Sequence, residues 1–109
     1  MVTKNILFKN YKIVKTQIRG RGTYSLWVAD TEEKKRIGLS RVKKLLPRTG
    51  MIFVYNSDVE NNFTMKETSI PLTIIFLDKD MNIIDAFKCK PFQSGPVNPG
   101  KPYRYVIEI

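Results

Sequence analysis

Three carboxylates, Asp58, Glu60 and Glu67, could supply a pair for acid–base chemistry, because they occur in one short segment of the chain. Such a pair works as general acid and general base only when the fold brings both groups to one reacting centre. Asp58 and Glu60 fall in a polar stretch, residues 56–62, that is typical of a solvated loop. Because the spacing does not force these carboxylates together, the sequence predicts no catalytic pair here.

A second acidic group, Asp78, Asp80 and Asn82, matches the first, third and fifth positions of a calcium-binding loop. The sixth position holds Ile83 where that loop needs glycine, and the twelfth holds Cys89 where it needs glutamate. A tight hairpin turn explains the same residues, so we expect a turn and no metal site.

Few residues of this chain suit nucleophilic catalysis, because it contains no histidine and only one cysteine, Cys89. Lys88 and Lys90 could lower the pKa of the thiol, but no imidazole is present to activate it. We therefore expect a structural cysteine, no catalytic residue, no cofactor and no enzyme activity. The single cysteine also excludes an internal disulfide framework.

Positive charge is the strongest compositional signal, with a net charge of +9 and 13 of the 19 Lys and Arg residues in the first 50 positions. Such a bias favours an anionic partner, which would be acidic protein, nucleic acid or a membrane surface, although it also suits a merely solvated surface. Arg19 and Arg21 beside Tyr24 and Trp27 could form a nucleic-acid surface or mark a hairpin tip. The basic residues predicted to contact a partner are Lys34, Lys35, Arg36, Arg41, Lys43, Lys44 and Arg48.

The elements that must carry these residues are mostly strands. Asp30 followed by Glu33 predicts a capped helix that ends at Gly38, and Ser40 could cap a second short turn over residues 41–46. Alternating or continuous apolar runs predict strands over residues 4–18, 24–28, 51–55, 63–65, 72–77, 83–87 and 103–109. Residues 1–109 are thus expected to form a single domain of the α+β class, mainly β, with one or two short helices. The strand spacing favours a compact antiparallel sheet or a partly closed barrel.

No apolar run is long enough for a transmembrane helix, and the first residues mix charged with apolar side chains. We therefore expect neither a membrane span nor a signal peptide, and a cytoplasmic or virion-associated protein.

Several segments together resemble the family called domain of unknown function 192, over about residues 11–109. They are ADTEEKKRIGL at 29–39, GMIFVY at 50–55, FTMKETSIPLTIIFLD at 63–78 and YRYVIEI at 103–109. The resemblance implies a compact, barrel-like β fold with a short helix after the Ala-Asp-Thr segment. Similar domains occur in bacteriophage genomes, and because the family has no established activity, the resemblance implies no catalytic residue.

The chain departs from the family pattern at Thr64, Glu67, Thr73 and Met81, where the family usually has Trp, Asn, Asp and a turn glycine. Because Met81 replaces that glycine, we expect Asn82 to supply any left-handed residue of the turn. The positions that still match are the best candidates for a functional surface, with packing at the start of a strand as the alternative reading. They are Met65, Lys66, Thr68 and Pro71.

These observations lead to a non-enzymatic binding or structural module that docks into a larger assembly, with a bacteriophage virion as the favoured setting and protein as the expected partner. A first alternative is a small-ligand binder or enzyme that uses residues 65–71 and nearby carboxylates; a pocket that holds Lys66 and Glu67 with convergent polar groups would support it. A second alternative is a direct nucleic-acid binder that uses the basic N-terminal half.

Overall fold

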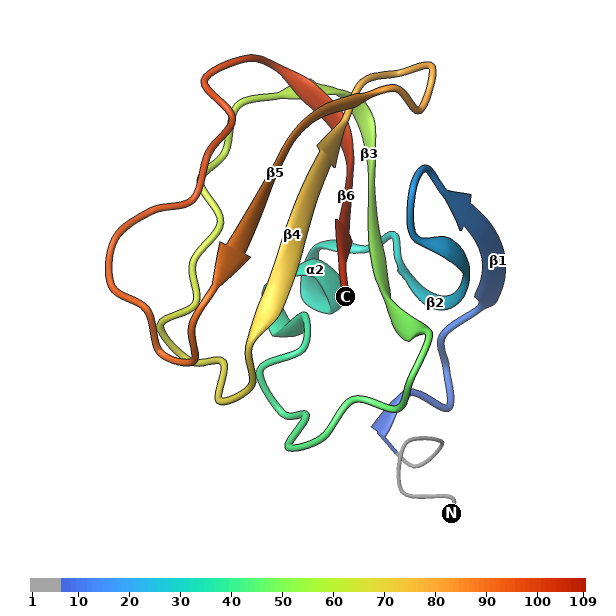
Figure 1. The fold of residues 1–109 in the computed structure, drawn as a ribbon, viewed down its shortest axis with the longest axis vertical. Coiled ribbons are helices and arrows are strands. Elements are labelled where there is room, and N and C mark those ends of the chain that lie inside the picture. The colour runs from blue at the N-terminus through green and yellow to red at the C-terminus, as the bar shows by residue number, and fades with distance from the viewer. Residues whose placement is uncertain (1–6) are drawn as a thin grey trace.

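The computed structural model describes residues 7–109, which form a six-stranded mixed sheet with the strand order β1-β2-β3-β6-β4-β5 (Figure 1). The elements are β1 (Ile13–Ile18), β2 (Gly22–Ala29), α2 (Glu32–Ile37), β3 (Thr49–Val59), β4 (Leu72–Leu77), β5 (Ile83–Cys89) and β6 (Tyr103–Glu108). The α+β, mainly β class expected from the sequence is therefore confirmed. Residues 4–6 of the first predicted strand lie outside the described residues.

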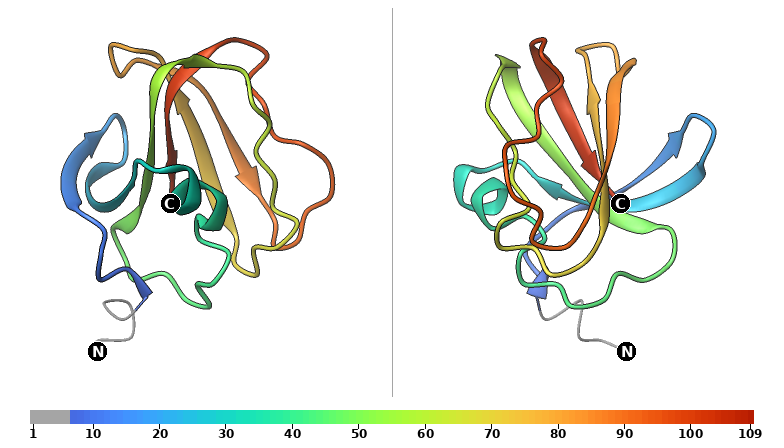
Figure 2. Two further views of the ribbon diagram at one scale, coloured as in Figure 1. Left: turned by 180° about the vertical axis from the view of Figure 1, so that it is seen from behind. Right: turned by 60° about the vertical axis from the view of Figure 1, so that its left-hand side comes forward.

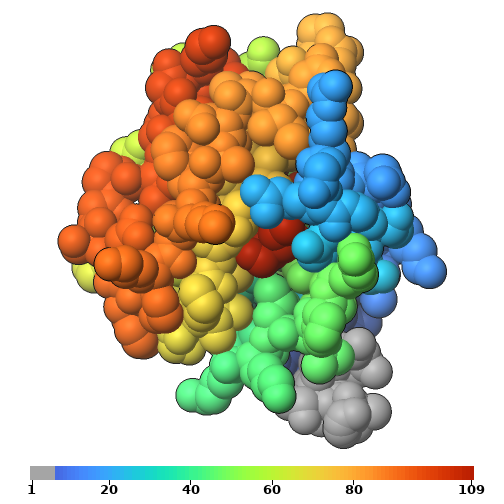
Figure 3. All heavy atoms as spheres, in the orientation of Figure 1, coloured from blue at the N-terminus to red at the C-terminus, as the bar shows by residue number. Residues whose placement is uncertain are grey.

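One strand pair corrects the expectation of a purely antiparallel sheet: β2 and β3 run parallel, whereas all other neighbours are antiparallel. Parallel neighbours need a crossover connection, and α2 with residues 38–48 provides it on one face of the sheet (Figure 2). Within residues 7–109, β1 and β5 remain the two edges of the sheet, so it does not close into a barrel. In the space-filling view the red C-terminal end of the chain is visible between β5 and the β1–β2 hairpin (Figure 3).

The helix begins one residue later than predicted, because Thr31 and not Asp30 is its N-cap. Thr31 Oγ1 accepts a hydrogen bond from the Lys34 backbone N–H at 3.2 Å, whereas the Asp30 carboxylate forms an ion pair with Lys34 at 3.8 Å. Gly38 ends the helix as predicted, with φ of 50° and its N–H donating to the Lys34 carbonyl.

Two other boundaries differ from the prediction. Residues 41–46 form no helix: the Ser40 hydroxyl donates to the Ile37 carbonyl instead of capping a following turn, and Val42 is buried in the core. β3 continues through residues 56–59, where a polar loop was expected, because Val59 pairs with Tyr103 across a bulge. The predicted strand at residues 63–65 is reduced to a single bridge between Phe63 and Val97.

The sheet buries apolar side chains on both faces. On the face that carries α2, side chains of the sheet pack with Leu39, Val42, Met65, Ile70 and Val97 from the irregular segments. The opposite face buries Ile18, Leu26, Ile52, Ile75, Leu77 and Ile107. Within residues 7–109, no helix is both long and apolar enough to cross a membrane.

The β4–β5 turn confirms one prediction and corrects another. Asp78 Oδ1 accepts the backbone N–H groups of Asp80 and Asn82, each at 2.9 Å, so this carboxylate organises a turn, as expected. The left-handed residue is Met81 itself, with φ of 66°, and not Asn82. Asn82 instead closes the turn through its backbone: its N–H donates to Asp78 Oδ1 and its carbonyl accepts from the Asp78 N–H.

Candidate functional site

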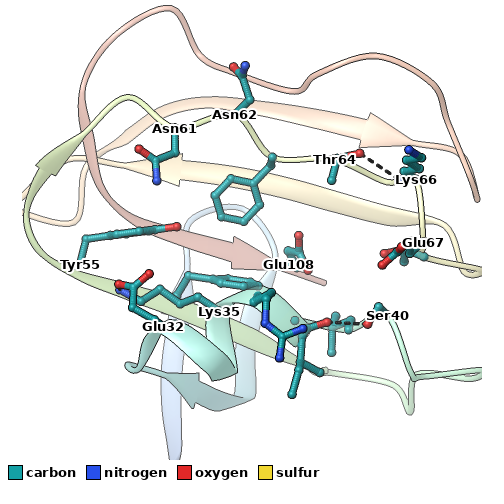
Figure 4. A pocket seen from close by; sticks show the side chains of 17 residues that line it. Glu32, Lys35, Ser40, Tyr55, Asn61, Asn62, Thr64, Lys66, Glu67 and Glu108 are labelled. Atoms are coloured by element: carbon teal, nitrogen blue, oxygen red, sulfur yellow. Dashed lines mark hydrogen bonds and ion pairs between the residues drawn. The ribbon is translucent and has the colours of Figure 1, made fainter.

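A cavity of about 470 Å³ opens on the face of the sheet that carries α2 (Figure 4). Its floor is formed by β3 and β6, one wall by α2 with residues 38–40, and the other by residues 61–68. The polar side chains that line it are Glu32, Lys35, Arg36, Ser40, Asn61, Asn62, Thr64, Lys66, Glu67, Thr68 and Glu108.

Glu108 is the polar group at the floor of this cavity, and it lies among apolar neighbours. It occupies β6 between two other strands, with Met51 of β3 and Ile74 of β4 as its partners in register. Its residue surface is 5% exposed. The alternation of side chains along β6 puts Glu108 on the same face as Val106, which packs in the core beneath α2.

The Glu108 carboxyl receives no hydrogen bond from residues 7–109, whereas every fully buried side-chain nitrogen or oxygen among these residues has a partner. Its oxygens must therefore border the cavity, as the close view shows. Burial disfavours the charged form and raises the pKa of Glu108 to about 8. At neutral pH the group is consequently mostly a neutral carboxylic acid, which can both donate and accept a hydrogen bond.

The wall nearest α2 is held by Lys35. Its ammonium donates to the Val54 carbonyl at 2.9 Å, lies 4.1 Å from the centroid of the Tyr55 ring, and forms an ion pair with Glu32 at 3.8 Å. Burial, together with the negative charges of Glu32 and Glu108, raises the pKa of Tyr55 to about 12. Tyr55 therefore stays a neutral phenol beside the cavity.

The opposite wall is an irregular segment that side-chain hydrogen bonds keep in place. Asn98 Nδ2 donates to the Glu60 carbonyl, the Asn61 carbonyl and Asn62 Oδ1, at 3.0, 3.2 and 3.0 Å. Thr64 Oγ1 accepts the Lys66 N–H at 3.0 Å. The segment thus has a defined backbone, from which the Asn61 side chain points toward the cavity and the Asn62 side chain points away from it (Figure 4).

The model of the family called domain of unknown function 192, described as an uncharacterized ACR, matches residues 14–109. The chain belongs to this family. The matched range covers the sheet, α2 and every wall of the cavity, so the site lies entirely within the family domain.

Two solved structures are similar to this family member. A protein of unknown function from Novosphingobium aromaticivorans DSM 12444 is 27% identical, with a TM-score of 0.77 over 91% of this chain and 72% of that one. A candidate transcription regulator from Sinorhizobium meliloti 1021 is 22% identical, with a TM-score of 0.78 over 91% of this chain and 78% of that one. The second likeness shows the fold alone. No curated protein matches the chain.

The four family positions singled out in the sequence divide between core and cavity. Met65 is fully buried in the core, whereas Lys66 and Thr68 line the cavity. Pro71 is exposed directly before β4. Glu67, a departure from the family pattern, also lines the cavity.

The basic residues predicted to contact a partner are distributed over several environments. Lys35 and Arg36 line the cavity, and Lys34 and Arg41 border a smaller hollow beside Tyr11. Arg48 donates to the Arg21 carbonyl at the tip of the β1–β2 hairpin. The remaining two, Lys43 and Lys44, are exposed in the connection between α2 and β3.

The carboxylates Asp58, Glu60 and Glu67 are not brought together. Asp58 accepts a hydrogen bond from Arg104 Nε at 3.0 Å, whereas Glu67 shares the cavity with Glu108 and Glu32. Cys89 is buried, and burial raises the pKa of its thiol, which opposes the activation that Lys88 and Lys90 could have provided.

Glu108 was not among the site residues predicted from the sequence. A signal was present in the run Val106-Ile107-Glu108-Ile109, where one acidic residue interrupts an apolar strand that ends the chain. Its position on the cavity face depends on the register of β6 against β3 and β4, which the pattern of a single strand does not contain.

Proposed function

We propose that this domain binds a small polar ligand in the cavity, with the Glu108 carboxyl as the group that recognises it. The observation that carries the proposal is the position of Glu108: a buried carboxyl in a central strand, without a hydrogen-bond partner among residues 7–109, that opens to a cavity. Because its oxygens border the cavity, a ligand that enters the cavity can hydrogen-bond to this group.

Glu108 occupies a buried strand position that suits an apolar residue. Removing a polar group from most of its water costs free energy, and here that cost is seen in the raised pKa of Glu108. An isoleucine or leucine would avoid this cost, as Ile74 does on the neighbouring strand, where it is fully buried. The carboxyl at this position is therefore explained better by binding than by packing.

Binding is favoured over catalysis because the cavity lacks an activated nucleophile. The chain has no histidine, and Cys89, the residue with the strongest intrinsic nucleophile, is buried with a raised thiol pKa. The cavity instead combines amides, hydroxyls and charges of both signs around aromatic side chains, which suits recognition.

The test is a screen of small polar compounds by amide NMR shifts, followed by titration of each hit against wild type, Glu108→Gln and Glu60→Gln. Glu60→Gln is the matched control, because it makes the same chemical change on an exposed carboxylate outside the cavity lining. We expect hits to shift the amides of residues 61–68 and of Glu108. A hydrogen bond between neutral groups contributes about 0.5–1.5 kcal/mol, so Glu108→Gln, which replaces the carboxyl O–H by an amide, should weaken binding roughly 2- to 12-fold. Hits that map elsewhere, or that bind Glu108→Gln as tightly as wild type, would contradict the proposal.

Docking into a larger assembly, such as a bacteriophage virion, stays a prediction from charge and composition. The exposed positions of Lys43, Lys44 and Arg36 are compatible with an acidic protein or a nucleic acid as the partner. Co-purification from the native source, with and without nuclease, separates these two partners from each other and from a free ligand-binding domain.

A further inference from the structure

Phe92, in the loop between β5 and β6, is an aromatic side chain that the core does not use. It is 60% exposed, although a phenyl ring in water forgoes the stabilisation that burial would give it. Its backbone has a φ of 55°, in the left-handed region that costs a bulky residue roughly 1–2 kcal/mol. Packing of the core therefore does not explain the position of the Phe92 ring.

Phe92 is nevertheless held firmly and is connected to the cavity. Its N–H donates to the carbonyl of Thr68, a residue of the cavity wall, at 2.9 Å. The loop around it is closed by Gln93, whose side-chain oxygen accepts the Lys90 N–H at 3.0 Å and whose N–H donates to the Lys90 carbonyl at 3.1 Å. The ring is thus presented from a defined loop rather than from a free end.

A second hollow of about 500 Å³ lies between Phe92 and residues 62–66. It shares four lining residues with the Glu108 cavity, which are Asn62, Phe63, Thr64 and Lys66. The two hollows therefore lie on the two sides of one short segment. A ligand longer than a single ring could cross this segment, with one end beside Glu108 and the other against Phe92.

The chemistry of the combined surface favours an uncharged ligand with many hydroxyl groups. The charged residues of the cavity largely balance one another, with the cationic Lys35, Arg36 and Lys66 against the acidic Glu32 and Glu67, while Glu108 is mostly neutral at neutral pH. Carboxyl, amide and hydroxyl groups on both walls can accept and donate hydrogen bonds at once, as sugar hydroxyls require. An exposed aromatic ring beside such groups can pack against the apolar face of a pyranose ring.

We infer that the surface from Glu108 to Phe92 binds an oligosaccharide, with one sugar unit in the Glu108 cavity and a following unit stacked on Phe92. The inference rests on the proposed ligand-binding function and names the class of ligand. It requires both hollows to be occupied together, so a trisaccharide should bind more tightly than its own monosaccharide.

The full chain is first applied to a panel of immobilised glycans. Each glycan that binds is then titrated in solution. Chitotriose, cellotriose and maltotriose are titrated whatever the result of the panel. The small polar compounds of the earlier screen are titrated in parallel. The variants are Phe92→Ala and Met81→Ala. Met81 is the matched control, because it is also an exposed apolar residue with positive φ, on the β4–β5 turn away from both hollows.

We expect at least one oligosaccharide to shift the amides of Glu108, Lys66 and Phe92, while its monosaccharide leaves the Phe92 amide unchanged. Phe92→Ala should weaken the oligosaccharide about tenfold, since aromatic packing contributes of that order, and Met81→Ala should leave its affinity unchanged. Equal affinities of wild type and Phe92→Ala would overturn the inference. If other small compounds bind beside Glu108 and no glycan binds, the inference is overturned but the proposed function stands. Absence of both kinds of binding would overturn the two together.

Discussion

The two faces of the sheet bury different kinds of side chain at neighbouring positions of one strand. Along β6, Ile107 points to one face and Glu108, the next residue, to the other. Ile107 packs between Ile52 and Ile75, its partners in register, and is 1% exposed. Glu108 is nearly as buried, yet its carboxyl borders a cavity.

The difference follows from what covers each face. The face of Ile107 is filled by strand side chains alone, which alternate regularly and interdigitate closely. The face of Glu108 is covered by α2 and by irregular segments whose polar groups need hydrogen bonds and cannot pack as densely. A buried carboxyl is therefore tolerated at Glu108, where irregular chain leaves space beside it. We expect a carboxyl at the next position, Ile107, to destabilise the fold.

Ile107→Glu tests this expectation and should have the largest effect on the free energy of unfolding. It places a carboxyl among apolar strand side chains, and the loss of apolar contacts adds to the cost of desolvation. We expect a loss of about 4 kcal/mol in the free energy of unfolding, measured by urea denaturation. Ile107→Leu, which keeps the side chain apolar and of similar volume, should cost less than about 1.5 kcal/mol. Similar stabilities for Ile107→Glu and wild type would show that the two faces do not differ as described.

The pH dependence of stability tests Glu108 on its own face. Its pKa is raised from 4.5 in the unfolded chain to about 8 in the folded state, so between these values the folded state keeps a proton that the unfolded state has released. The contribution of Glu108 to the free energy of unfolding is therefore greatest below pH 4.5, and it is lost as the pH rises toward 8.

Between about pH 5 and pH 8, the free energy of unfolding of wild type should fall by roughly 1.4 kcal/mol per pH unit relative to that of Glu108→Gln. Urea denaturation of both proteins across this range measures the difference, and the subtraction removes the contribution of the other carboxylates. A difference that stays constant with pH would mean that the Glu108 carboxyl is solvated normally.

Lys35→Met should have a smaller effect, because it keeps the apolar stem against Tyr55 and removes only the ammonium. Loss of the bond to Val54 and of the cation–π contact should cost about 1 kcal/mol in thermal or urea unfolding. Lys34→Met is the control: Lys34 makes the same kinds of contact with Tyr11 and Asn10 but is more exposed, so we expect about half that loss. Equal losses would show that the cavity wall gives Lys35 no special environment.

Met81→Gly, at the end of the sheet next to Ile107, should have the smallest effect and the opposite sign. Relief of the left-handed backbone gains roughly 1–2 kcal/mol and the added freedom of glycine in the unfolded chain offsets about half of it. We expect a net stabilisation of about 0.5 kcal/mol, seen as a rise of a few degrees in Tm. Asn82→Gly should bring no gain, and the opposite ranking would place the left-handed residue at Asn82.

Much of the fold could be read from local patterns. The apolar runs that become β4 and β6 were predicted nearly to the residue, as were the β4–β5 hairpin and the helix end at Gly38. The boundaries that were wrong depend on distant partners: β3 extends to Val59 because Tyr103 pairs with it. The N-cap is a local exception: the Thr31 hydroxyl, and not the Asp30 carboxylate, accepts the Lys34 N–H.

The candidate site was only half visible in the same patterns. Lys66, Glu67 and Thr68 were noticed because they belong to a recognisable segment. Asn61 is one of several polar residues in its stretch, and the acidic interruption at Glu108 does not by itself show which face of the sheet the side chain takes. Residues from α2, β3, the 61–68 segment and β6 meet only after the parallel β2–β3 crossover puts α2 above β6.

Composition and short-range pattern were sufficient for the fold class, the family and the lack of histidine-based chemistry, because these depend on residue types and on the period of a single strand. The cavity, the burial of Glu108 and the placement of its carboxyl depended on strand order and register. A shift of one residue along β6 would exchange Glu108 with Ile107, and only pairing between strands far apart in the chain selects which of the two faces the cavity.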